Sequence, residues 1–488
     1  MRHNKVKKRL LGVLAVLLLV AAAYAGAELW RQREAGADDA LAVLEPKKET
    51  IVLWYTDDAL TDYLNNKALD FLEKNDIRVE AKLVSGLEYL ESINEASIRE
   101  ERDAPDVYIV SNDLLEKAYL SGLAVELADG GPVSAANGFQ QAAVNAVTYD
   151  GKIVGCPLYF ETSALLYNKT YLEQIAQAAA ETEQDDGETA DTAPVEGADD
   201  GQPITAAELI PSSIADILNF ADSYSAPENV EYFFRWDVSD IFYNYFFIGN
   251  YISVGGDAGD DKSRIDIYNR ESIASLKVYQ DLNQFFSIDT KETTYDTILQ
   301  EFLEGRTIYT IATSDCIRKL DEAAADGEFA YEYGIAMLPD INAELSTKGM
   351  SVTNALAVNG YSEHKAAANR FLAYLAGEAS ADLYDMTGKI SAVTQPSYAD
   401  AHVEAFMQSY AASAPIPKMI ETSNFWIELE ICFAKVWDGE DANEQIRTLS
   451  EKIKTQLAGE PVAEVVLEDP QVELLPATEY EDSGETAE

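Results

Sequence analysis

A chain of 488 residues, 47% of them hydrophobic, is long enough for two or three domains with sizeable cores. Its 86 acidic and 36 basic residues give a formal net charge of −50, which excludes a nucleic-acid partner because few cations could neutralise phosphates. The three scattered cysteines and three histidines predict neither a disulfide framework nor a metal or other cofactor site. We expect the cysteines to be buried as small hydrophobic residues.

The N-terminus has the charge order of an export signal. Basic residues precede an apolar run from Leu10 to Ala27. Ala23-Tyr24-Ala25 would serve as a cleavage site, but the run is also as long as a minimal membrane span. We therefore predict a signal peptide or membrane anchor over residues 1–30 and a polar tether over 31–48. The rest of the chain would lie outside the cytoplasm, either anchored or secreted after cleavage.

Strand and helix patterns alternate after the tether, which is typical of a doubly wound α/β unit. In such sheets ligands meet the loops that follow the strands, here Trp54–Asp58 and Ser111–Asp113. Strands are predicted over residues 50–55, 79–83 and 105–110, and helices over 60–72 and 113–120.

The middle of the chain contains a turn followed by two apolar runs. Asp150-Gly151 is a hairpin signal, and apolar residues lie on both sides of Pro157. The second run, Ala164–Tyr167, predicts a buried strand. Glu161 lies between the two runs, and a carboxylate in that position needs a partner or a function because burying it unpaired is costly.

Two acidic segments and one aromatic segment stand out further along. Residues 177–205 are acidic and poor in large apolar residues, so we predict a disordered insert. Residues 459–488 are acidic and interrupted by Pro, so we predict a disordered tail. The aromatic residues of 232–247 recur roughly three and four apart, which predicts helical core. Other helices are predicted over 211–224, 273–286, 297–303, 365–375, 423–436 and 442–457, and strands over 305–311, 333–339 and 355–358.

Five stretches together resemble the extracellular solute-binding proteins of the maltose-binding type, which serve sugar ABC transporters. DGKIVGCPLYFETSALLYNK (150–169) looks like the segment that crosses between the lobes of that family. PDVYIVSNDLLEKAYLSGL (105–123) resembles its strand-to-helix ligand loop. FLEGRTIYTIATSDCIRKL (302–320), YGIAMLP (333–339) with the stretch 349–377, and SNFWIELEICFAKVWDGEDANEQIRTL (423–449) match in the same order.

The resemblance implies an α/β, two-lobed periplasmic-binding-protein-like fold with hinge crossovers and a cleft between the lobes. Such proteins close about a hinge when ligand binds. The implied first lobe comprises residues 49–160 and 339–378, and the second lobe 161–338 and 379–458. Crossovers are expected near Phe160–Ser163, Met337–Pro339 and Gly377–Ala379.

The implied function is that of a monomeric, non-enzymatic receptor that delivers a sugar or oligosaccharide to an ABC transporter permease. Sugar clefts combine aromatic rings with carboxylates and amides. By match to the family, Trp426 falls at a stacking position, and Glu161 and Asp113 fall at carboxylates that bind sugar hydroxyls. The alternatives are a core position for Trp426, a hinge salt bridge for Glu161 and a helix N-cap for Asp113.

Four further aromatic residues are candidates for the cleft. Trp54, Tyr55 and Trp236 could lie either in the cleft or in the core, and Tyr159 lies next to the proposed crossover. The family often has aromatic residues in the loop after the strand that ends here at Ile311. This chain has Thr313-Ser314-Asp315 instead, so one stacking platform is missing and the length of the ligand is open.

Rival functions remain at this point. The acidic composition would also suit a polyamine, whose ammonium groups pair with carboxylates and stack on the same aromatic rings. Iron would require a cluster of Tyr and His residues, which is not evident in the sequence. A glycosidase could use a carboxylate pair such as Glu161 and Asp113, but any long acidic chain offers such pairs.

Overall fold

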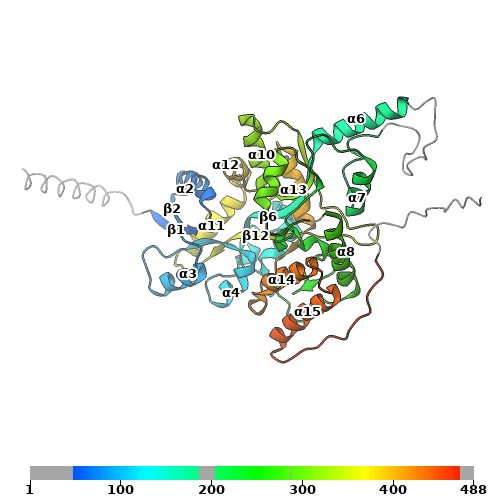
Figure 1. Cartoon of the computed structure of the whole chain (residues 1–488). Helices are drawn as coiled ribbons and strands as arrows, with labels where there is room; N and C mark the ends of the chain where they lie inside the picture. Colours follow the sequence, from blue (N-terminus) through cyan, green and yellow to red (C-terminus); the bar gives the residue numbers. More distant parts are fainter. Residues whose placement is uncertain (1–47, 186–203, 287, 473–488) are drawn as a thin grey trace, which may run out of the picture.

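The computed structural model describes residues 48–185, 204–286 and 288–472 (Figure 1). The predicted anchor and nearly all of the tether lie outside these residues. No helix within the described ranges is long and apolar enough to cross a membrane.

A nine-stranded sheet runs through the described part of the chain (Figure 1). Its main order is β2-β1-β3-β12-β6-β10-β7, with β11 paired to β6 and β13 paired to β12. Parallel strands β1, β2 and β3 occupy one end, as the alternating pattern predicts. The strands are β1 (Glu49–Tyr55), β2 (Ile77–Leu83), β3 (Val107–Ser111), β6 (Cys156–Asn168), β7 (Tyr232–Phe234), β10 (Thr307–Thr313), β11 (Tyr333–Ala336), β12 (Met350–Val358) and β13 (Ala414–Pro415).

Strand β6 connects the two ends of the sheet. It pairs with β12 as far as Thr162 and with β10 from Ser163 onwards. This change of partner falls within the Phe160–Ser163 position predicted for a crossing. The two predicted apolar runs form one continuous strand, and Pro157 is accommodated where the β12 register shifts at Asn354/Ala355.

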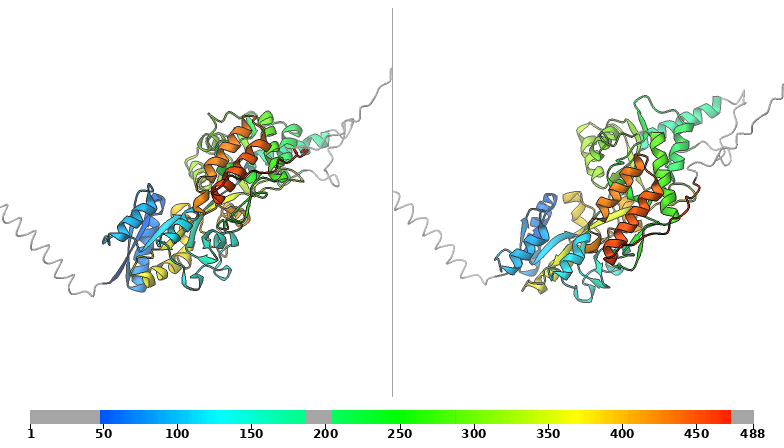
Figure 2. Two further views of the ribbon diagram at one scale, coloured as in Figure 1. Left: turned by 90° about the horizontal axis from the view of Figure 1, so that it is seen from below. Right: turned by 60° about the horizontal axis from the view of Figure 1, so that its bottom comes forward.

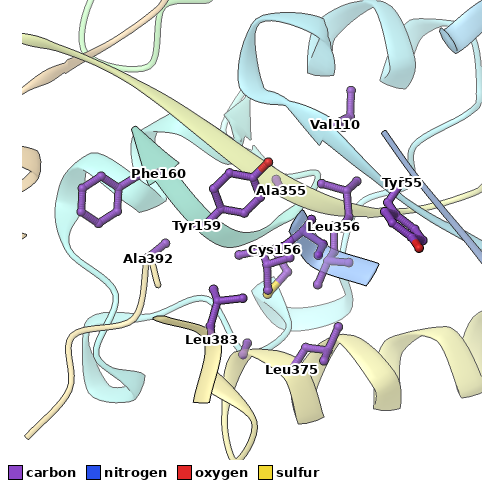
Figure 3. Packing of buried hydrophobic residues seen from close by; sticks show 14 of the residues in the cluster. Tyr55, Val110, Cys156, Tyr159, Phe160, Ala355, Leu356, Leu375, Leu383 and Ala392 are labelled. Atoms are coloured by element: carbon purple, nitrogen blue, oxygen red, sulfur yellow. The ribbon is translucent and has the colours of Figure 1, made fainter. Parts of the chain in front are cut away.

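The first of two hydrophobic cores lies around β1, β3 and β12 and continues past the crossing to Phe302 and Ile317, and the second lies around β7 and β10. Figure 2 shows the blue N-terminal part and the green and orange part at opposite ends of the molecule. Figure 3 shows the first core, where Cys156 and Leu356 pack against Leu375 and Leu383. The arrangement is the predicted α/β fold of two lobes. The helices are α2 (Thr61–Asn75), α3 (Tyr89–Ile98), α4 (Leu115–Leu120), α5 (Gln141–Val147), α6 (Lys169–Asp185), α7 (Ile214–Ser223), α8 (Arg270–Phe286), α9 (Tyr295–Leu303), α10 (Asp315–Asp326), α11 (Lys365–Ala376), α12 (Leu383–Thr387), α13 (Ala401–Ala412), α14 (Phe425–Trp437) and α15 (Ala442–Ala458).

The Asp150-Gly151 hairpin is present between β4 (Thr148–Tyr149) and β5 (Lys152–Ile153). Both turn residues have positive φ, as a two-residue hairpin of this kind requires. All three cysteines are buried and unpaired, as expected.

The aromatic segment 232–247 is buried but is not the predicted helix. It forms strand β7 and two short 3-10 turns, Ile241–Tyr243 and Tyr245–Phe247. Polar side chains compete with the helical backbone here. The Asn244 amide donates to the carbonyls of Asp237 and Asp240, at 2.8 and 2.7 Å.

Parts of both segments that were predicted to be disordered are ordered in the structure. Helix α6 continues through Asp185, so the insert begins later than residue 177. At the other end, residues 460–472 lack regular structure but are bound to the second lobe. Lys454 pairs with Glu464 at 2.6 Å, and Tyr268 accepts a hydrogen bond from the Leu467 amide at 2.9 Å. Composition alone did not reveal these contacts.

The predicted lobe boundaries remain a prediction. The structure adds that α12 packs against α2, so first-lobe contacts extend beyond the Gly377–Ala379 crossover that the resemblance implied. Strand β13 pairs with β12 and begins more than thirty residues after the Gly377–Ala379 position. It therefore offers a later position for the third crossing.

Candidate ligand-binding site

A cavity of about 770 Å³ lies beside the crossing strands. Its floor comes from Glu161 of β6 and from Met350 and Val352 of β12. The loop after α12 (387–389) forms one wall. The opposite wall comes from second-lobe elements, namely residues 240–243 and the starts of α9, α10 and α14. The cavity therefore lies where relative movement of the lobes would change its shape.

Three aromatic rings, those of Tyr243, Tyr295 and Trp426, line the second-lobe wall of the cavity. Tyr243 and Tyr295 stack with their ring centroids 4.9 Å apart and their planes inclined by 19°. Trp426 is half-buried and packs edge-on against Tyr245, at 5.6 Å between centroids. These contacts hold the rings in place before any ligand arrives.

The Tyr295 hydroxyl is fixed by the turn after β10. It donates to Oδ1 of Asp315 at 2.9 Å and accepts from the Thr313 amide at 3.4 Å. Burial, with Cys316 and Asp315 nearby, raises the pKa of Tyr295 well above its usual value, so the phenol remains a donor. Tyr295 thus places an aromatic ring beside the turn Thr313-Ser314-Asp315, which has no aromatic residue of its own.

Lys389 joins the cavity to the first lobe. Its ammonium lies 3.0 Å from Oε1 of Glu161 and 3.0 Å from Oδ2 of Asp57, in the loop after β1. The same ammonium stands 5.4 Å from the centre of the Tyr159 ring. Burial disfavours the charge, but the two carboxylates outweigh burial and raise the pKa of Lys389.

The other basic side chains of the cavity wall also have acidic partners. Lys319 pairs with Asp315 at 2.8 Å, and Arg318 pairs with Glu322 at 2.8 Å. The cavity therefore offers carboxylate acceptors, ammonium and guanidinium donors and flat apolar rings, and most of its carboxylates are paired. Across the described ranges, no group of His, Cys, Asp and Glu side chains has the geometry to hold a metal ion.

Two of the seven residues predicted from the sequence line this cavity, Glu161 and Trp426. Glu161 also forms the salt bridge that was its alternative role. Tyr159 lies just behind, 4% exposed, with its hydroxyl 3.5 Å from Asp57 Oδ2. Tyr159 and Glu161 lie at the cavity because both belong to β6, which passes along its floor.

The structure places the other four predicted residues away from the cavity lining. Trp236 is completely buried, stacks on Phe234 and donates to Asn244 at 2.8 Å, so it offers no face to a ligand. Tyr55 is 2% exposed and donates to Thr61 at 3.0 Å. Trp54 packs on the first core.

The Trp54 indole donates to the Asp103 carbonyl at 3.0 Å. Asp113 lies inside a 3-10 turn rather than at its N-cap, which is Ser111. It accepts from the Ser111 hydroxyl, and burial raises its pKa. For Trp54, Tyr55 and Trp236 the contacts support the core alternative, whereas Asp113 occupies neither the cavity lining nor the N-cap position that was its alternative.

Sequence reasoning missed Asp57, Tyr243, Tyr295 and Lys389. Asp57 belongs to the loop that was predicted to meet ligand, so its position was a usable signal. Tyr243 was hidden among aromatic residues that were taken as helical core. Lys389 had no signal, because its partners Asp57 and Glu161 are more than two hundred residues away.

Comparison with known proteins places this geometry in context. The bacterial extracellular solute-binding protein family matches residues 66–412. The maltodextrin-binding protein MdxE of Bacillus subtilis is 22% identical over 411 residues, which are 80% of this chain and 88% of that protein.

Solved structures show the same fold. An extracellular solute-binding protein of Staphylococcus aureus in complex with maltose gives a TM-score of 0.67 at 18% identity, covering 85% of this chain and 99% of that one. The maltose-binding periplasmic protein MalE of Listeria monocytogenes, also in complex with maltose, gives 0.64 at 21% identity, covering 86% and 100%. The chain belongs to the bacterial extracellular solute-binding proteins.

Proposed function

We propose that the protein captures a sugar or oligosaccharide outside the cytoplasm and delivers it to an ABC transporter permease. The observation that carries this proposal is the cavity itself, where Trp426 and the stacked Tyr243–Tyr295 pair lie beside carboxylates and ammonium groups. Sugar rings present apolar C–H faces to aromatic rings and hydroxyls to charged and polar groups. The relatives named above with maltose bound support the same class of ligand.

Each part of the cavity has a role in this proposal. Trp426 and Tyr295 stack on sugar rings from the second-lobe wall. Glu161 and Asp315 accept hydrogen bonds from hydroxyls, and Lys389 donates to them while it holds Glu161 in place.

Closure of the two lobes would trap the ligand. Walls from both sides of the crossing line the cavity, so a closed form makes contacts with the sugar that an open form lacks. Ligand then shifts the population towards the closed form. The loop 387–389 and the start of α14 are the walls that would approach each other.

A polyamine is the weaker candidate. A dication needs carboxylates without other partners, whereas Glu161, Asp315 and Glu322 already pair with basic side chains of the cavity wall, which leaves Asp240 as the lining carboxylate without a salt bridge among the described residues. Binding a polyamine would therefore place like charges close together. We further propose that the receptor is a monomer without catalytic activity, held at the membrane by residues 1–30 or released by their cleavage.

Thermal unfolding and calorimetry of the purified full-length chain test the proposal. The ligands are maltose, maltotriose, maltotetraose and spermidine, because a ligand that binds only the folded state raises the melting temperature. We expect at least one sugar to do so. A response to spermidine alone, or to none of the sugars, would contradict the proposal.

A pair of variants on α14 tests the site. Trp426→Ala should weaken sugar binding by about 30-fold or more, the usual loss for a buried aromatic anchor. Ile427→Ala is the matched control, because Ile427 is the next residue of the same helix, is 63% exposed and lies outside the cavity lining. Equal affinity of the two variants for sugar would contradict the assignment of Trp426 to the binding site.

A further inference from the structure

A second, aromatic pocket lies on the far part of the second lobe. It has a volume of about 530 Å³ and is bordered by α7, the edge strand β7 and the end of α8. Phe234 and Phe286 join it to the core, whereas Phe285 at its rim is 56% exposed. An exposed aromatic ring at a pocket rim commonly marks a place where something docks.

The C-terminal segment approaches this pocket along α8. The Leu467 amide donates to Tyr268, which precedes the helix, and two residues later Asp469 pairs with Lys277 at 2.5 Å. Asn443 donates to the Leu467 carbonyl and to Asp469, at 2.9 and 2.6 Å. The segment therefore runs in the same direction as α8.

Distance along the helix predicts where the chain goes next. Phe285 lies eight residues beyond Lys277 on the same helix face, which is about 12 Å at 1.5 Å per residue. An extended chain covers about 3.3 Å per residue, so about four residues beyond Asp469 reach Phe285. The next apolar residues of the sequence are Leu474 and Leu475.

Side-chain alternation selects one of these two leucines. Val472 is half-buried and packs against the second core. In an extended chain, residues two apart point to the same side, so an extended continuation beyond Val472 would direct Leu474 towards the lobe and Leu475 away from it. We propose that the aromatic pocket bordered by Phe233, Phe285 and Phe286 is the docking site for Leu474 of the chain's own C-terminal tail.

This docking would close an exposed edge of the second lobe. Strand β7 is the last strand of the sheet and pairs with β10 at only two positions, Thr307↔Tyr232 and Tyr309↔Phe234. A leucine in the adjacent pocket would shield aromatic surface beside this short edge from other chains.

Cross-linking tests the proposal. The three native cysteines are buried, so cysteines placed at exposed sites can be joined selectively by a short bismaleimide. Asn219→Cys on the pocket rim with Leu475→Cys should give an intramolecular cross-link in the full-length protein. The control pair, Leu69→Cys on α2 of the first lobe with Leu475→Cys, should give almost none. Equal yields from the two pairs would overturn the proposal.

Two substitutions make the test specific. Hydrogen exchange of a peptide spanning residues 470–480 should be at least about tenfold slower than in an unstructured chain. Leu474→Asp should abolish both this protection and the cross-link, whereas Leu475→Asp should leave the protection intact. Equal exchange in the two aspartate variants would refute the assignment of Leu474.

The rival occupant is a sugar, since rings and the carboxylates of Asp222 and Glu231 border the pocket. Maltotriose is therefore added to the cross-linking pair in a Trp426→Ala background, which removes the main cavity as a competitor. Unchanged cross-linking is expected. Loss of the cross-link with rising maltotriose would show that the pocket takes sugar and would overturn the proposal.

Discussion

Two lysines connect parts of the chain that are far apart in sequence, and they do so in opposite ways. Lys389 lies at the cavity with Glu161 and Asp57 each 3.0 Å away. Lys418 is 1% exposed and donates to two backbone carbonyls, Asn145 at 3.2 Å and Ala258. No carboxylate of the described residues lies within salt-bridge distance of Lys418.

The pKa values of the two ammonium groups shift in opposite directions. Carboxylates outweigh burial at Lys389 and raise its pKa. Burial dominates at Lys418 and lowers its pKa to about 8, although Asp260 and Glu116 oppose this effect. Whether a partly or fully buried lysine favours its charged form thus depends on its counter-ions.

Tight packing explains why Lys418 remains buried. The loop 255–260 folds over it, and the Lys418 amide donates to the Gly259 carbonyl at 2.9 Å. Gly259 has a φ of +69°, and a Cβ there would meet the Pro417 Cα at 2.9 Å. This contact between distant segments requires glycine.

The largest expected effect comes from reversing the buried charge. Lys418→Glu should lower the free energy of unfolding by about 3 kcal/mol or more, because a carboxylate would face backbone carbonyls with Glu116 and Asp260 nearby. Denaturant titration measures the change. Lys435→Glu is the control, since that side chain is 45% exposed and should cost less than about 1 kcal/mol. Similar losses in both variants would mean that the Lys418 site is solvated.

The pH dependence of stability should differ in sign between the two lysines. The folded pKa of Lys418 is below its unfolded value of 10.5, so the folded state loses its proton first. Relative to Lys418→Met, the wild type should therefore gain up to about 3 kcal/mol as the pH rises from 7 to 10.5.

Lys389 should show the reverse. Its raised pKa gives stability that is present below the unfolded pKa and lost as the pH rises through the folded pKa. Denaturation of the wild type, Lys418→Met and Lys389→Met measures both trends, between pH 7 and 10.5 for Lys418 and above pH 10.5 for Lys389. Parallel trends would contradict the comparison.

Neutralising Lys389 at pH 7 should have a moderate effect. Lys389→Met should lower the free energy of unfolding by about 1 kcal/mol, because the side chains of its partners Asp57 and Glu161 are 26% and 40% exposed and regain water. It should also weaken sugar binding, because Glu161 loses the group that orients it. Lys389→Arg, the matched control, should retain most of the stability and most of the sugar affinity. Unchanged calorimetric affinity in Lys389→Met would remove Lys389 from the site.

The smallest effect concerns a buried acid without a counter-ion. Burial raises the pKa of Asp113 despite the hydrogen bond from Ser111. Asp113→Asn should stabilise the protein at pH 7 by less than about 1 kcal/mol, because the amide carries no charge to desolvate. The gain should shrink as the pH falls through the raised pKa. A clear loss of stability at pH 7 would show that Ser111 and the backbone compensate the charge fully.

Local pattern was a reliable guide where one physical signal dominated. The apolar periodicity of α2, α8 and α15 and the Asp150-Gly151 turn were all visible in the sequence. The crossing at Phe160–Ser163 and the positions of Glu161 and Trp426 came from the resemblance to a family. These features depend on neighbours in the chain or on motifs that can be matched.

Other features depend on partners that are distant in the chain. The acidic segment 460–472 lacks regular secondary structure, yet Lys277, Asn443 and Lys454 hold it in place. Trp236 and Tyr55 had the chemistry of ligand-binding residues, but the packing of the lobes buries them.

The sequence by itself determined an exported α/β protein, because charge order, apolar periodicity and turn residues act over short stretches of chain. Only the tertiary structure decided which aromatic rings face the cavity and which lysine meets carboxylates. Lys389 and Lys418 are the same residue type, twenty-nine positions apart, and the sequence gives no reason to separate them. Their opposite electrostatics arise from Asp57, Glu161, Asn145 and Ala258, which folding brings to them from more than a hundred residues away.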